Sequence, residues 1–134
     1  MGRARARQEI TGLTLDAGAL IAVERGNGRM IALLRKMALE KRVLHIPAPA
    51  LGQAWRGGER QVLLARLVAL PEVSVVPLDE LQARACGALC GVTHTSDVID
   101  ASIVLCAHAH GDRVITSDVR DLKRIDPSLD AVQI

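Results

Sequence analysis

The sequence predicts an α/β sandwich built around a mainly parallel sheet. Short apolar runs alternate along the chain with longer segments of helical periodicity. Glycine and proline punctuate most of the boundaries between them. Apolar residues make up 49% of the 134 positions, which is enough for the core of one domain of this length.

The predicted elements follow one another without an internal repeat or a low-complexity linker. The short apolar runs predict strands at residues 13–16, 43–46, 73–76 and 113–116, and an edge strand at 131–133. The longer segments predict helices at residues 17–24, 29–42, 47–56, 59–70, 78–90, 97–110 and 118–124.

Local chemistry sets the predicted boundaries. The first helix stops at Gly26 and Gly28. The helix over residues 47–56 is opened by Pro47, because proline suits a first turn, and it breaks before the glycine pair at residues 57–58. Pro71 ends the helix that precedes the third strand.

Composition excludes several classes of function. The chain has no Phe or Tyr and one Trp, which excludes base recognition by aromatic stacking. A net charge of +2 is too small for a protein that coats nucleic acid. No GxGxxG or Walker A sequence follows a strand, so no nucleotide cofactor is predicted. The apolar runs fall short of the roughly 20 residues that a membrane span needs.

The termini and the cysteines predict the compartment. Residues 1–10 contain three arginines but no following apolar segment of a signal peptide, so we expect a flexible basic arm before a single domain at 11–134. Cys86, Cys90 and Cys106 lie in apolar surroundings. They predict reduced core thiols of a cytoplasmic protein rather than a disulfide framework or a zinc site.

Three aspartates stand at or near predicted helix starts in apolar surroundings: Asp16, Asp100 and Asp118. Helix capping alone explains Asp16 and Asp118. It explains Asp100 less well, because the helix continues in apolar residues and an unpaired buried charge costs several kcal/mol. Asp97 lies one turn earlier on the same face, and it is interpreted either as an N-cap or as part of a metal site.

These aspartates predict a metal site at one edge of the sheet. Ligands of parallel sheets bind beyond the carboxyl ends of the strands. If the strands that end at Asp16 and Thr116 are neighbours, Asp16, Asp97, Asp100 and Asp118 converge with no basic residue close in sequence. A hard divalent cation bound through oxygen, Mg²⁺ or Mn²⁺, would compensate their charge.

Four segments in this order resemble a known family: LTLDAGALIA, PAPALGQAWRGG, DVIDASIVLCA and VITSD-x-x-DL. They resemble PIN-domain endoribonucleases, specifically VapC-type toxins of bacterial toxin–antitoxin pairs, from Leu13 to Leu122. The resemblance implies a three-layer α/β/α sandwich whose acids bind Mg²⁺ or Mn²⁺. It also implies that a water attacks an RNA phosphodiester, leaving 5′-phosphate and 3′-hydroxyl ends, and that a cognate antitoxin neutralises the enzyme.

Residue by residue, the resemblance implies three catalytic acids: Asp16, Asp100 and Asp118. It implies an accessory role for Asp97 and for two polar neighbours, Thr116 and Ser117. No histidine is predicted to act as a general base, since the four histidines fall in the second strand, a loop and a helix end.

One position departs from the family. Where a glutamate usually follows the second strand, this chain has Gln53, which removes a negative charge on which metal affinity depends. We hypothesise that Asp97 replaces that charge; Glu24 is the less favoured substitute. A catalytically weak PIN fold that binds RNA or protein is therefore the alternative function. A third interpretation is a structural domain with ordinary caps, whose carboxylates do not converge.

Partner surfaces are also predicted. Arg56 and Arg60 flank the glycine pair near Gln53 and are candidates for contacts with RNA phosphates. The helix over residues 61–70 is apolar over more of its circumference than one buried stripe requires. We therefore expect a homodimer or an antitoxin contact there.

Overall fold

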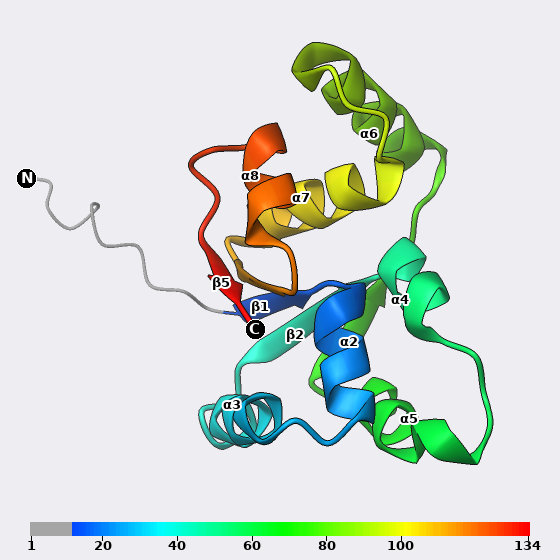
Figure 1. Cartoon of the computed structure of the whole chain (residues 1–134), viewed down its shortest axis with the longest axis vertical. Coiled ribbons are helices and arrows are strands. Elements are labelled where there is room, and N and C mark those ends of the chain that lie inside the picture. The colour runs from blue at the N-terminus through cyan, green and yellow to red at the C-terminus, as the bar shows by residue number, and fades with distance from the viewer. Residues whose placement is uncertain (1–11) are drawn as a thin grey trace, which may run out of the picture.

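A computed structural model describes residues 12–134, which build a five-stranded sheet with the order β3-β2-β1-β4-β5 (Figure 1). Every neighbouring pair of strands is parallel, as predicted. The strands are β1 (Gly12–Leu15), β2 (Val43–Pro47), β3 (Val73–Val76), β4 (Arg113–Thr116) and β5 (Ala131–Gln133). The arm expected at residues 1–10 lies outside the described residues.

Helices cover both faces of the sheet, which confirms the three-layer α/β/α sandwich. One group comprises α2 (Ala17–Glu24), α3 (Gly28–Leu39) and α5 (Val62–Val68). The other comprises α6 (Glu80–Thr93), α7 (Val98–His110) and α8 (Val119–Ile125). The short α4 (Ala48–Ala54) follows β2, and a 3₁₀ turn, η1 (Glu59–Gln61), precedes α5.

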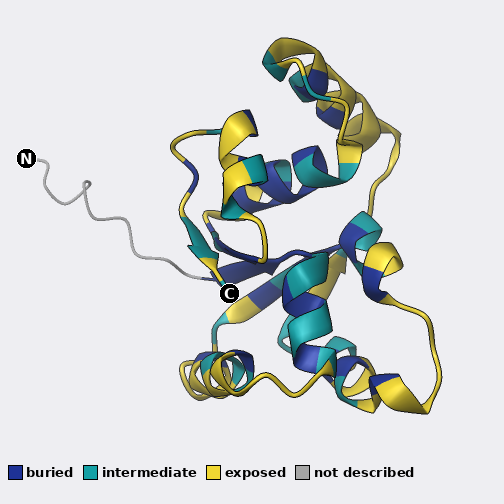
Figure 2. Cartoon of the chain, viewed as in Figure 1, coloured by how far each residue is buried: buried dark blue, intermediate teal, exposed yellow. Residues whose placement is uncertain are grey.

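The central strands are buried on both sides, because each helical layer packs its own apolar cluster against the sheet (Figure 2). On β4, Ile115 belongs to the cluster under α2 and α3, whereas Val114 belongs to the cluster under α7 and α8. The alternation follows from the two-residue period of a strand.

The predicted order of elements is correct, and several predicted ends are wrong. The helix expected at residues 29–42 ends at Leu39, just before Lys41 adopts a positive φ of 56°. The helix expected at residues 47–56 ends at Ala54, because Trp55 is extended. The helix expected at residues 59–70 begins as η1, with Gln61 outside the α region, and continues as α5 only to Val68.

The strand order reverses between β1 and β4, and in parallel sheets such a switch point opens a crevice beyond the strand ends. The helices on either side of the sheet are short. Within residues 12–134 no single helix has the length and apolarity to cross a membrane; α6 and α7 meet that test only jointly, with a bend of 107° between them.

Candidate metal centre

Asp16 lies at the switch point, directly after β1, and only 7% of its surface is exposed. Its Oδ1 accepts a 2.8 Å hydrogen bond from the backbone of Ala19, which caps α2. Its Oδ2 accepts a hydrogen bond from the Thr116 hydroxyl at the end of β4. Burial raises the pKa of the Asp16 carboxyl, and these hydrogen bonds oppose the rise.

Two more aspartates begin α7. Asp97 is the N-cap, and its carboxylate accepts a 2.9 Å hydrogen bond from the backbone of Asp100. Asp100 is half-buried in the first turn, and burial is the largest cause that raises its pKa to about 6. Repulsion from other carboxylates adds to this rise, in descending order from Asp97, Asp121 and Asp16.

The start of α8 repeats this arrangement. Asp118 is the N-cap, and its carboxylate accepts a 3.2 Å hydrogen bond from the backbone of Asp121. The side chain of Asp118 raises the pKa of Asp121, and the charge of Asp97 adds to that rise. The carboxylates after β1 and at the starts of α7 and α8 therefore act on one another electrostatically.

A small cavity of about 150 Å³ lies between the starts of α7 and α8. Asp97, Asp100 and Asp121 line it together with Arg124. Arg124 lies 3.5 Å from Asp121, which corrects the expectation that no basic residue compensates these acids. Because Arg124 is two-thirds exposed, it compensates the cluster only weakly. Oxygen-rich, net negative surroundings of this kind suit a hard divalent cation.

Asp121 is a further carboxylate of this cavity that was not predicted from the sequence. The signal was present, because Asp118-x-x-Asp121 has the same spacing as Asp97-x-x-Asp100. Each N-cap aspartate at these two helices is thus paired with an aspartate in the first turn. Asp97, Asp100 and Asp121 thus share one cavity, but among residues 12–134 the aspartates do not form a group whose ligand atoms all lie within 4.8 Å of one another.

Gln53 does not line the cavity of Asp97 and Asp100. It is exposed and lines a second cavity of about 310 Å³ with Glu24, Arg56 and Arg60. The carboxylate that shares a cavity with Gln53 is therefore Glu24.

The buried Gln61 organises this second cavity. Its Oε1 accepts hydrogen bonds from the backbones of Arg56 and Gly57, at 2.7 Å and 2.8 Å. Its Nε2 donates to the Glu24 carboxylate and to the carbonyl of Ala54. All donors and acceptors of this amide are used, so Gln61 fixes the loop that carries Arg56.

Ser117, predicted as a polar neighbour of the site, packs against the start of α2. It lines a cavity with Gly18 at the β1–β4 boundary. A Cβ on Gly18 would overlap the side chain of Ser117. The glycine of the LTLDAGAL segment therefore lets α2 approach the end of β4 closely.

The cysteines and histidines give one further correction. Cys86 and Cys90 pack in an apolar cluster with Ala101, as expected for core thiols. His45 and His110, however, lie beside each other and beside Asp112, and none of the three was predicted to belong to a site.

A parallel α/β/α sandwich with aspartates at the strand ends and helix starts where the strand order reverses defines the class of this protein. The chain belongs to the PIN domain family, whose model matches residues 13–127. The members of this family are nucleases, and they use divalent metals. A search of curated proteins found no match.

Solved structures with the same fold include complexes on DNA. The VapBC2 structure from Rickettsia felis, bound to a DNA fragment from its promoter, matches with a TM-score of 0.67 and 15% identity over 92% of this chain and 98% of that one. FitAB bound to an IR36 DNA fragment matches with a TM-score of 0.62 and 18% identity, over 90% and 94% of the two chains. FitAcB from Neisseria gonorrhoeae matches with a TM-score of 0.60 and 18% identity, over 90% of this chain and 96% of that one.

Proposed function

We propose that this PIN-domain protein is a metal-dependent endoribonuclease toxin, which a cognate antitoxin neutralises in the cytoplasm. The observation that carries the proposal is the cavity that Asp97, Asp100 and Asp121 line together at the starts of α7 and α8. Burial, and then the charges of Asp97, Asp121 and Asp16, raise the pKa of Asp100. A structural domain does not need so many mutually repelling acids at one edge of its sheet. A divalent cation relieves that repulsion.

Asp16, Asp97, Asp100 and Asp118 are the proposed ligands of Mg²⁺ or Mn²⁺, and Asp121 joins them. When bound, the ion supplies a water of lowered pKa and neutralises charge on the scissile phosphate. The chain's own residues set the geometry.

Thr116 has the first positioning role, because it orients the buried Asp16 carboxylate by a hydrogen bond. Asp100 must lose its proton to serve as a ligand, so its contribution increases as the pH rises through about 6. Ser117, which follows Thr116 in the chain, is the second proposed polar neighbour of these carboxylates.

RNA binding is assigned to the cavity of Gln53. Arg56 and Arg60 both line it and are exposed, which suits contacts with phosphates. Contacts between these arginines and phosphates would position the RNA. Such contacts do not require the aromatic residues Phe and Tyr, which the chain lacks.

An antitoxin and a second copy of the chain are the proposed protein partners. The VapC-type motifs support the antitoxin, as does the fold shared with the VapBC2 and FitAB assemblies. Exposed apolar side chains support protein contacts: Leu81 on α6 is 73% exposed and Val92 is 76% exposed. On α5, Leu64 and Leu67 are buried in the core, and Val62 is the large apolar residue that is exposed.

The alternative is a catalytically weak module that binds RNA or protein. Gln53 favours this alternative, because an amide stands where the family usually has a carboxylate and because it lies apart from Asp100.

One cleavage experiment separates the two functions. Purified chain is incubated with structured RNA and Mn²⁺, with and without EDTA, alongside Asp16→Asn. Asp79→Asn is the matched control, since Asp79 caps α6 in the same way but does not line the cavity of Asp97 and Asp100. The nuclease proposal predicts cleavage by wild type and Asp79→Asn that EDTA and Asp16→Asn abolish. RNA binding without metal-dependent cleavage identifies the weak module.

A further inference from the structure

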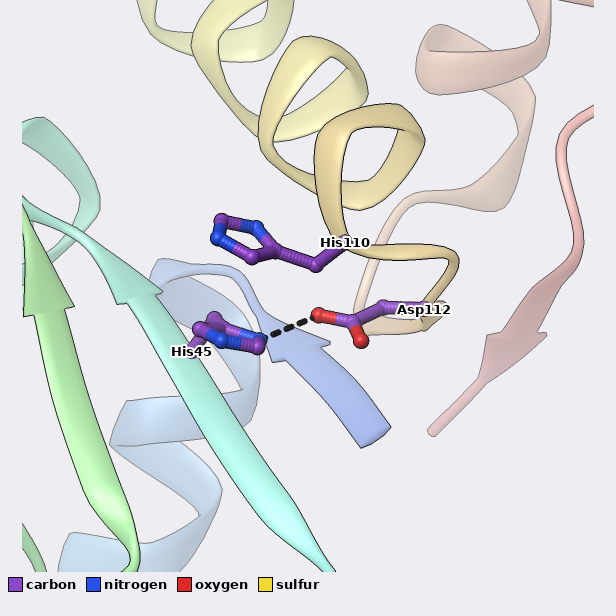
Figure 3. A group of neighbouring side chains, drawn as sticks. All are labelled: His45, His110 and Asp112. Carbon is purple, nitrogen blue, oxygen red and sulfur yellow. Dashed lines mark hydrogen bonds and ion pairs between the residues drawn. The ribbon is translucent and has the colours of Figure 1, made fainter. Parts of the chain in front are cut away.

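A group of side chains that could hold a metal ion lies away from the aspartates at the switch point, between the sheet and α7 (Figure 3). His45 comes from the middle of β2, His110 ends α7, and Asp112 precedes β4. Each offers a ligand atom, and these atoms lie within 4.8 Å of one another. Imidazole nitrogen with carboxylate oxygen suits first-row transition ions such as Zn²⁺, in contrast to the all-oxygen set at the switch point.

The carboxylate of Asp112 is incompletely compensated. Its side chain is fully buried, and Oδ2 lies 2.6 Å from His45 Nδ1 and accepts a 2.8 Å hydrogen bond from Thr14. Its Oδ1 is buried without a hydrogen-bond partner among the described residues. A buried carboxylate with an unsatisfied oxygen is costly unless a cation balances it.

The fold keeps space for this carboxylate. A Cβ on Gly12, at the start of β1, would lie 2.8 Å from Asp112 Oδ1 and 2.6 Å from the carbonyl oxygen of Val43. Any larger residue at this position would displace the Asp112 carboxylate or separate β1 from β2. The glycine and the Thr14 hydroxyl together hold Asp112 in place, as residues around metal ligands do.

His110 has one ring nitrogen free to bind an ion. Nδ1 of His110 lies 2.9 Å from the backbone carbonyl of Cys106, so this nitrogen carries the proton and Nε2 is left as a ligand atom. The rings of His45 and His110 are stacked, with centroids 3.8 Å apart and planes at 19°. His110 is exposed at the helix end, so its ring is able to turn toward an ion.

Cys106 lies beside this cluster, outside the set whose ligand atoms are within 4.8 Å of one another, so it would have to move to bind as a fourth ligand. Its Sγ lies 3.8 Å from His110 Nδ1 and 3.7 Å from the Thr14 hydroxyl. Burial raises the pKa of this thiol to about 11, so the free protein holds it protonated and an ion would displace the proton. A cavity of about 270 Å³ lined by Cys106 and His110 leads to this side of the cluster.

We propose that His45, His110 and Asp112 bind a transition ion of the Zn²⁺ class, with Cys106 as the fourth ligand. The ion replaces the proton between His45 and Asp112, whose ligand atoms move slightly apart to accept metal bonds of roughly 2.0–2.1 Å. Four protein ligands leave no open position, so the site is structural: it ties β2, the end of α7 and the start of β4 together.

Cobalt tests this site independently of nuclease activity. The protein is stripped of metal with EDTA, dialysed and titrated with Co²⁺. Excess Mg²⁺ is present to fill the proposed site of Asp16, Asp97, Asp100 and Asp118, the oxygen-rich site. We expect one equivalent of Co²⁺ with the intense visible bands of tetrahedral coordination and a thiolate-to-cobalt charge-transfer band. We also expect Zn²⁺ to displace it and to raise the midpoint of thermal unfolding.

Variants locate the ion. His110→Ala is expected to weaken Co²⁺ binding at least about tenfold, and Cys106→Ser is expected to remove the charge-transfer band. His108→Ala is the matched control on the same helix end, since His108 pairs with Asp126 instead, and Asp100→Asn is the control for the acidic site. Circular dichroism checks that each variant is folded. Absence of the tetrahedral spectrum in wild type overturns the proposal, as does its retention in His110→Ala or its loss in Asp100→Asn.

Discussion

The hydroxyl of Thr116 donates a 2.5 Å hydrogen bond to Oδ2 of Asp16, although the two residues lie 100 positions apart in the chain. The hydroxyl oxygen of Thr116 also accepts a 2.8 Å hydrogen bond from the backbone of Asp118. One hydroxyl thus connects the end of β1, the end of β4 and the start of α8. These are the segments that bring two of the proposed catalytic acids to the switch point of the sheet.

Thr116→Val removes this hydroxyl and keeps the shape of the side chain. The variant leaves a buried oxygen of Asp16 and the backbone N–H of Asp118 without their partner. We therefore expect the free energy of unfolding to fall by about 1–3 kcal/mol. Urea denaturation measures the change. Thr116→Ser keeps the hydroxyl and should recover most of the loss; a Val variant as stable as wild type would show that the hydrogen bond contributes nothing.

Asp100 should make the stability of the metal-free protein depend on pH. Its pKa is about 6 in the folded chain against 3.8 for an ordinary aspartate. The folded state therefore binds more protons than the unfolded state between these values, and the contribution of Asp100 to the free energy of unfolding falls as the pH rises through this window. Above it, the cost of the ionised carboxylate stays constant.

Urea denaturation in EDTA over a pH series tests this dependence, with Asp100→Asn as the comparison. The variant should lose the part of the slope that lies between pH 3.8 and about 6. An unchanged pH profile in Asp100→Asn would contradict the assignment. Mn²⁺ affinity should have the opposite dependence and increase with pH, because the ion competes with the proton for the same oxygens.

Gly18→Ala tests the close approach of α2 to the end of β4. Alanine normally stabilises a helix relative to glycine by about 1 kcal/mol. Here its Cβ would overlap Ser117 and come within 3.2 Å of the Ser117 backbone nitrogen, so we expect a net loss of about 1–3 kcal/mol in thermal or urea unfolding. The double variant Gly18→Ala/Ser117→Gly removes the overlap and should restore stability. A single variant more stable than wild type would exclude the overlap.

The sequence predicts the fold well because burial determines the pattern. The strands at Val73–Val76, Arg113–Thr116 and Ala131–Gln133 and the helix Ala17–Glu24 have the predicted bounds. One error in the predicted helices lies where a side chain competes with the regular backbone. Gln61 bonds to the backbones of Arg56 and Gly57, and the chain there forms a 3₁₀ turn where periodicity alone predicts a helix.

The oxygen-rich site and the histidine site differ in how far they can be predicted. Asp16 and Asp118 lie where parallel strands end, and that rule is enough to place them at one edge of the sheet from the sequence alone. His45, His110 and Asp112 follow no motif spacing. They meet because β2 pairs with β1 in the register His45 to Thr14 and because α7 ends over that pair, which only the tertiary structure reveals.

Asp97→Asn tests whether Asp97 supplies the charge that Gln53 lacks. Asparagine caps a helix as well as aspartate does, so the substitution removes the charge and keeps the cap. We expect at least about tenfold weaker Mn²⁺ binding by isothermal titration. Asp79→Asn, at the N-cap of α6, is the matched control and should bind as wild type does.

The same titration tests the competing residue. Glu24 shares the cavity of Gln53 and accepts a hydrogen bond from Gln61. Unchanged Mn²⁺ binding in Asp97→Asn sinks the hypothesis. If Glu24→Gln then weakens binding, the compensating charge belongs to Glu24 and the ion lies closer to Gln53.

Arg56→Glu tests the proposed RNA surface. The guanidinium is exposed and donates to the carbonyls of Gly52 and Trp55, which holds it at the rim of the Gln53 cavity. Loss of one phosphate contact should weaken RNA binding and reduce the slope of log K against log salt by roughly 0.7 for a single strand. Filter binding over a salt series measures both quantities.

Arg84→Glu controls for net charge in this experiment, because it changes the total charge by the same amount on α6. Long-range attraction between the chain and RNA weakens equally in both variants, and salt screens it within a Debye length of about 10 Å at 0.1 M. A local phosphate contact is lost only in Arg56→Glu. Equal effects of the two substitutions would therefore assign the binding to overall charge and remove Arg56 from the RNA surface.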